Sequence, residues 1–199
     1  MSTEGRHPSV PVVRFTRAEL EAFRDATVPD LAGPGLKLLF VGINPGLWTA
    51  AVQAHFGRRG NRFYPALFRA GIVDRLIDPS GGMSTADHDH LVERGVGITN
   101  LVARATARAD ELAAGELAAG ARDLAARAAR LRPAVVAVLG ITAYRSAFGE
   151  PSATAGRQPG DLAGAQVWVA PNPSGLNAHA SLDTLAAAYR DIARAAGVV

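Results

Sequence analysis

The chain has 199 residues, is 48% hydrophobic and carries a formal net charge of +3. This content suffices for one sizeable core, so we expect a single domain over residues 16–199 after a mobile tail over residues 1–15. Cysteine is absent, which excludes disulfides, thiolate zinc sites and iron–sulfur clusters. We find no signal sequence and no apolar run of membrane-spanning length, and therefore expect a cytoplasmic protein.

The first elements lead to a rigid polar turn. Thr16 and Glu19 form a capping-box pattern, which predicts a helix to about Ala26. The short apolar run Leu38–Val41 ends at glycine, as a buried strand does. The turn Gly42-Ile-Asn-Pro-Gly46 follows, and Asn44 is its only polar side chain. Ligands bind at the carboxyl ends of strands in open α/β sheets, so Asn44 is a candidate site residue. The alternative is an ordinary strand exit, with Asn44 bonding its own backbone.

Residues 47–60 have no clear periodicity and are predicted to form a long loop. Its notable side chains are Trp48, Thr49, His55, Phe56, Arg58 and Arg59. An aromatic ring beside arginines suits base stacking and phosphate contact. A surface loop pinned by one buried phenylalanine is equally consistent with the pattern. A helix over residues 61–70 is predicted next, with Gly71 ending it.

The second half alternates strands with helices. A polar helix from Ser84 to Arg94 carries His88 and His90, which are two residues apart and read as solvated rather than metal-binding. We predict strands at 95–102, 133–140 and 166–170, helices at 111–130, 141–148 and 181–196, and a loop at 150–164. Asn100 lies at the end of the first of these strands, and Thr106 on the loop after it. The alternation predicts an α/β fold with a mainly parallel sheet.

A second proline-containing turn, residues 171–179, follows the last predicted strand. Together with three earlier segments it resembles the mismatch-specific uracil-DNA glycosylase and thymine-DNA glycosylase family of the uracil-DNA glycosylase superfamily. The four segments are Gly42-Ile-Asn-Pro-Gly46, Asn61-Arg-Phe-Tyr64, Gly97-Ile-Thr-Asn-Leu-Val102 and Asn172-Pro-Ser-Gly-Leu176. Each is weak alone, but all four occur in order at plausible spacing, and the likeness runs from about Leu36 to Arg190.

The resemblance implies a three-layer α/β/α sandwich with a DNA groove across the carboxyl ends of the strands. It implies a monomeric base excision repair enzyme that acts on double-stranded DNA containing a G·U mismatch or a damaged pyrimidine. Such an enzyme flips uracil or a related pyrimidine out of the duplex and hydrolyses its N-glycosidic bond, which leaves an abasic site. It requires no metal and no cofactor.

The resemblance also implies roles for individual residues. Asn44 would orient the attacking water. The base pocket would comprise Ile43, Phe56, Thr49, Asn100 and Thr106. The DNA contacts would come from Ser174, Gly175, Leu176, Asn177, Arg58, Arg59 and Arg62. Leu176 would be the wedge that fills the vacated stack. Asn177 and Ala178 stand where some bacterial relatives have a small polar residue and an arginine, so contacts to the opposite guanine stay open.

A non-catalytic nucleotide-binding or lesion-binding α/β module is the alternative function, because it would share the sheet and the loops. The glycines of the Gly42–Gly46 turn do not have the spacing of a Walker loop or a dinucleotide fingerprint, which counts against a nucleotide binder.

Overall fold

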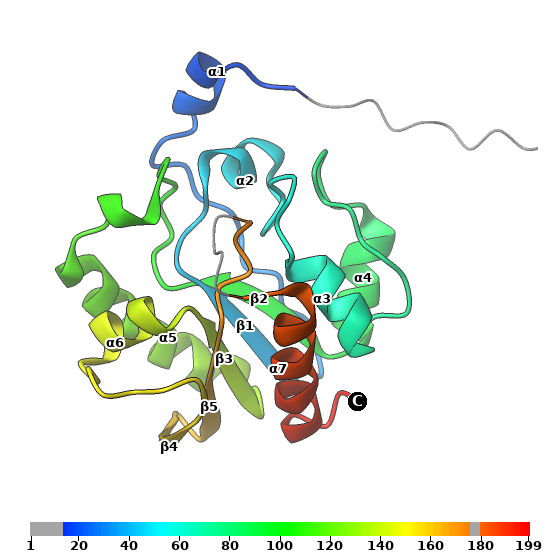
Figure 1. Ribbon diagram of the computed structural model, residues 1–199, viewed down its shortest axis with the longest axis vertical. Helices are drawn as coiled ribbons and strands as arrows, with labels where there is room; N and C mark the ends of the chain where they lie inside the picture. The colour runs from blue at the N-terminus through cyan, green and yellow to red at the C-terminus, as the bar shows by residue number, and fades with distance from the viewer. Residues whose placement is uncertain (1–13, 176–179) are drawn as a thin grey trace, which may run out of the picture.

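The computed structural model describes residues 14–175 and 180–199, and in this part of the chain a five-stranded sheet forms the centre (Figure 1). The strand order is β2-β1-β3-β5-β4. The parallel strands are β1 (Leu38–Gly42), β2 (Val96–Asn100), β3 (Val135–Leu139) and β5 (Ala165–Ala170). β4 (Gly156–Leu162) pairs antiparallel with β5 at one edge. The mainly parallel α/β sheet predicted from the sequence is confirmed.

Helices cover both faces of this sheet, which gives the three layers. One face packs against α3 (Phe63–Ala70), α4 (Thr85–Glu93) and α7 (Leu182–Ala195). The other packs against α5 (Ala114–Leu131) and α6 (Ile141–Phe148). Two short helices, α1 (Arg17–Glu21) and α2 (Leu47–Val52), lie near the carboxyl ends of the strands, as does the 3₁₀ turn Ala109–Glu111. None of the helices in the described ranges is long and apolar enough to cross a membrane.

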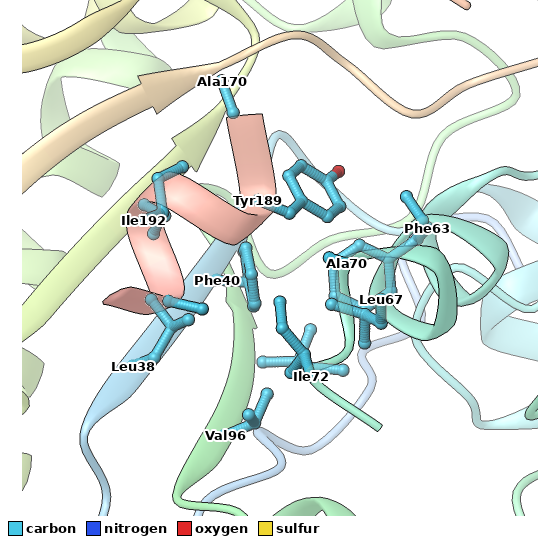
Figure 2. Packing of buried hydrophobic residues seen from close by; sticks show 14 of the residues in the cluster. Leu38, Phe40, Phe63, Leu67, Ala70, Ile72, Val96, Ala170, Tyr189 and Ile192 are labelled. Carbon is cyan, nitrogen blue, oxygen red and sulfur yellow. The ribbon is translucent and has the colours of Figure 1, made fainter. Parts of the chain in front are cut away.

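The core between the sheet and the α3–α7 pair combines aliphatic side chains with a group of aromatic rings (Figure 2). Phe40 of β1 meets Phe63 of α3 edge to face, with ring centroids 5.2 Å apart, and Tyr189 of α7 packs against both rings. Such pairs add to the free energy of burial because the edge of one ring faces the electron-rich face of the other. The first turn of α3 is therefore fixed against β1.

Two segments predicted as loops are regular elements. Residues 47–52 form α2, which begins at Gly46 without a side-chain cap and so lacks the usual start signal. Residues 156–162 form β4, although this strand contains two glycines and a proline. Pro159 falls within the register shift between Arg157 and Asp161, on an edge strand where a missing N–H donor is tolerated.

Three smaller expectations were also wrong. α1 ends at Glu21 rather than near Ala26, and the helix expected at 111–130 is divided into a 3₁₀ turn and α5. His88 is exposed as expected, but His90 is buried, with its Nε2 3.3 Å from Asp74 Oδ1. His90 lies in the last turn of α4, on the buried side of the helix. Residues two positions apart point to different sides of a helix, so His88 remains exposed.

The buried tyrosines give a first prediction. Tyr189 Oη is buried without a hydrogen-bond partner among the described residues, whereas Tyr64 Oη donates to His55 O at 3.0 Å. An unsatisfied buried hydroxyl costs free energy, so Tyr189→Phe should raise the free energy of unfolding by about 1 kcal/mol. Tyr64→Phe, the matched control, should lower it by about 1 kcal/mol because it leaves the His55 carbonyl unpaired. Urea denaturation measures both, and a loss of stability in Tyr189→Phe would contradict the assignment.

Candidate functional site

A cavity of about 390 Å³ lies at the carboxyl ends of the central strands. The parallel register pairs Gly42 of β1 with Asn100 of β2, so the turn after β1 and the end of β2 meet there. The predicted site residues that line the cavity are Ile43, Asn44, Thr49, Phe56, Arg58, Asn100, Thr106 and Ser174. His55, Asn61 and Asn172 also line it, although none of them was predicted as a site residue. Residues from distant parts of the chain therefore converge on one cavity.

Gly42 is the point of closest approach in this cavity. A Cβ atom built on it would lie 2.4 Å from Asn100 Oδ1 and 3.2 Å from Phe56 Cζ. Only a residue without a side chain lets the Asn100 amide and the Phe56 ring come so near to the strand end. The glycine in the turn is thus required by packing across strands, in addition to the turn itself.

The amide of Asn44 has a defined orientation. Its Nδ2 donates to Arg104 O at 3.0 Å and to Thr106 Oγ1 at 2.8 Å. A backbone carbonyl can only accept, and Thr106 directs its own proton to Arg108 O at 2.8 Å, so both partners require the NH₂ group on their side. Asn44 Oδ1 therefore lies on the opposite side, and no described residue donates to it. The alternative, in which Asn44 bonds its own backbone, is not found among the described residues, and Thr106 accepts from the Asn44 amide instead.

The amide of Asn100 is oriented by the buried His55. Pro29 O lies 2.9 Å from His55 Nε2, so this nitrogen carries the proton, and the neutral ring accepts from Asn100 Nδ2 through Nδ1 at 3.3 Å. Burial lowers the pKa of His55, which keeps the ring neutral near pH 7. Asn100 Oδ1 consequently faces the space above Gly42. The sequence signal for His55 was weak, because its partners are far away in the chain.

Phe56 forms one wall of the cavity. Its ring stacks on Phe63, with centroids 4.2 Å apart and an interplanar angle of 26°. Its backbone is left-handed, with φ of 55°, which turns the main chain beside the ring. Among the described residues, none accepts a hydrogen bond from the N–H of Phe56 or of Ile43. Both residues line the cavity, so its wall includes an aromatic side chain and two backbone N–H groups that have no acceptor in the described chain.

The residues predicted to contact DNA do not all lie in the same environment. Arg58 and Arg59 are exposed, and neither pairs with a described residue. Arg62 instead directs its guanidinium at the carbonyls of Ser174 and Ala180. Leu176 and Asn177, like Ala178 and His179, lie outside the described residues. In the part of the chain that is described, no group of three or more Asp, Glu or His side chains could hold a metal ion.

Comparison with known proteins places this arrangement in a family. Residues 29–193 match the family model for the uracil DNA glycosylase superfamily, which is most of the chain. The chain belongs to the uracil-DNA glycosylase superfamily. The fold also resembles a solution NMR structure from Methanosarcina acetivorans, described as a candidate uracil DNA glycosylase, with a TM-score of 0.54 and 14% identity. The match covers 84% of this chain and 98% of that one, and at this identity it supports the fold alone. Membership in the superfamily assigns DNA glycosylase activity in general, with DNA as substrate.

The close packing at Gly42 of this superfamily member is testable. Gly42→Ala should lower the free energy of unfolding by about 1–3 kcal/mol, because its Cβ would overlap Asn100 Oδ1. Gly46→Ala is the matched control, since no atom lies within 4 Å of its added Cβ and its φ of −77° suits alanine. It should change stability by less than about 1 kcal/mol. If denaturant titrations give the same loss of stability for both variants, overlap with Asn100 is not the cause of the loss.

Burial of His55 predicts a pH dependence of stability. Its folded-state pKa lies below its ordinary value of 6.5, so the unfolded chain binds a proton that the folded protein excludes. Stability should therefore fall as pH drops below 6.5, by up to about 1.4 kcal/mol per pH unit from this group, until the folded pKa is reached. His55→Gln should show a smaller slope, as measured by urea denaturation between pH 8 and 5. Identical slopes would remove His55 as the source.

Proposed function

We propose that this glycosylase excises uracil, or a related damaged or mismatched pyrimidine, opposite guanine in duplex DNA, as the mismatch-specific subfamily does. The observation that carries the proposal is the fixed amide of Asn44, whose NH₂ group is held by Arg104 O and Thr106 Oγ1. Its carbonyl oxygen therefore has no donor among the described residues, and it lies beside a cavity large enough for a flipped base. No cofactor is needed, and residues 16–199 would act as one monomeric domain.

The residues of the cavity suit a hydrolysis in which the enzyme positions the base and the water. A duplex encloses its bases, so the target pyrimidine is first extruded, at a cost that is smallest for a mispaired base. The extruded ring would stack on Phe56, which Phe63 supports from behind. Asn44 Oδ1 would accept a hydrogen bond from a water and hold it against the sugar carbon. An amide does not usefully titrate near neutral pH, so Asn44 orients the water without taking its proton.

The departing base carries negative charge, and the cavity offers neutral donors for it. The N–H groups of Ile43 and Phe56 would bond the anionic pyrimidine edge, as an oxyanion hole does for an acyl intermediate. Because no carboxylate base is present at the Asn44 turn, we expect slower hydrolysis than in relatives with aspartate at this position. Leu176 would fill the gap in the stack, and Ser174 and Gly175 would hold the strand backbone.

One assay tests the function directly. The protein is incubated with a duplex that contains one G·U pair, and abasic sites are then cleaved with alkali. Strand scission at the uracil supports the proposal. Tight binding without scission would instead indicate a reader of DNA lesions that does not turn over, and neither binding nor scission would reject both functions.

The role of Asn44 predicts a large kinetic effect. Asn44→Ala should bind G·U duplex normally but lose roughly 10²-fold or more in single-turnover rate. Thr106→Val keeps the shape of the side chain but removes the acceptor for Asn44 Nδ2, and should show a smaller loss of the same kind. Thr106→Ser retains the hydroxyl and is the control. A normal rate in Asn44→Ala would remove it from the mechanism.

Thr49 predicts which pyrimidine is accepted. It is buried and lines the cavity, and by resemblance it borders C5 of the flipped base, where thymine has its methyl group. A β-branched side chain cannot easily rotate away, so uracil should be preferred to thymine opposite guanine by roughly 10- to 100-fold. Thr49→Gly should raise the ratio of thymine to uracil excision. If single-turnover rates on G·T and G·U duplexes fall together, Thr49 only supports the loop.

A further inference from the structure

Arg62 bonds to both ends of one short loop. We call residues 172–180 the 172–180 loop, of which the structure describes 172–175 and 180. The Arg62 N–H donates to Pro173 O at 3.0 Å, and Nη2 donates to Ser174 O at 2.6 Å. Nη1 donates to Ala180 O on the other side of the loop. One residue therefore ties the chain entering the loop to the chain leaving it.

The surroundings of Arg62 favour a structural contact over a phosphate contact. Its Nε is buried. Burial raises the pKa of Tyr189, and the positive charge of Arg62 opposes part of that rise. A partly buried cation is costly unless acceptors replace water, and the loop carbonyls provide them. Arg58 and Arg59, four and three positions earlier, are exposed.

The same turn of α3 also supports the aromatic wall of the cavity. Phe63 follows Arg62 directly and stacks on Phe56, while it is itself buried against Phe40. On the loop side, a Cβ on Gly175 would lie 2.7 Å from Gly60 O, so the loop passes very close to the chain that leads into α3. The start of α3 thus sets the distance between Phe56 and the 172–180 loop.

We propose that Arg62 is a positioning residue that keeps the two described ends of the 172–180 loop, at Pro173–Ser174 and at Ala180, in fixed positions relative to α3. This rests on the proposed function, in which the loop enters the DNA stack. When the loop enters a duplex, its contacts must compensate for the free energy of unstacking the bases. A single strand has no paired stack that the loop must separate. Loss of Arg62 should therefore slow excision from duplex DNA selectively.

The fork of the guanidinium matters for this role. Two terminal nitrogens in one plane reach two carbonyls at once, which a single ammonium cannot reproduce with the same geometry. Arg62→Lys should therefore behave like Arg62→Gln, despite keeping the charge. If charge alone were important, as in a phosphate contact, the lysine variant would retain most of the activity.

The experiment compares single-turnover rates on a G·U duplex and on the same uracil strand alone. In Arg62→Lys and Arg62→Gln, the duplex rate should fall at least about tenfold relative to the single-strand rate. Both rates come from one preparation, so a misfolded fraction cancels from their ratio. The slope of log affinity against log salt should stay unchanged. Arg59→Gln, the matched control, should reduce that slope by about one and leave the rate ratio unchanged.

Three results would overturn the assignment: an unchanged rate ratio, a salt slope reduced by one in Arg62→Gln, or full activity in Arg62→Lys. A wild-type protein that excises no uracil would reject the proposed function instead. Hydrogen exchange then still tests Arg62, because it needs no turnover. Peptides containing Ser174 and Ala180 should exchange faster in Arg62→Gln than in wild type, and equal exchange would overturn the proposal.

Discussion

The pairing of Gly42 with Asn100 at the end of two parallel strands is the contact on which the site depends. Sheet hydrogen bonds fix this register, and both strands are completely buried, so neither end can shift without disturbing the core. The missing side chain at Gly42 then lets the Asn100 amide and the Phe56 ring occupy the same small region. The turn that carries Asn44 starts at this point, so its place is set by the sheet.

Two amides of the site obtain their orientation from backbone carbonyls. Arg104 O accepts a hydrogen bond directly from the Asn44 amide. Pro29 O fixes the tautomer of His55, and His55 in turn accepts from the Asn100 amide. A carbonyl cannot become a donor, so neither amide orientation depends on a charged side chain. Neutral, preoriented groups suit a reaction whose leaving group becomes an anion, because they need no rearrangement as charge develops. Protonation of His55 would give Nδ1 a proton and so oppose the Asn100 N–H.

The sequence predicted the strands well because each buried parallel strand is a continuous apolar run between breakers, as in Val135–Leu139. It failed at β4, where burial is low and pairing with β5 alone decides the structure, and at α2, which begins without a capping side chain. The positions of Asn44 and Asn100 at strand ends were readable from local pattern. The contacts of His55 and Arg62 were not readable from it, because their partners are 26 to 118 residues away in the chain.

The loop that orients Asn44 is itself near the surface, and charged groups fix it. Arg104, whose carbonyl accepts from Asn44, places its guanidinium on Glu116 at 2.6 and 3.0 Å and on Asp25 at 3.1 Å. The hydrogen bonds from Arg104 lower the pKa of Glu116 to about 2, so the pair stays ionised across the physiological range. Exposed ion pairs add little to stability. Yet a bidentate pair restricts geometry, and small displacements of a positioning group are costly in rate. Around Arg104, charge therefore contributes to the placement of a neutral amide more than to the stability of the fold.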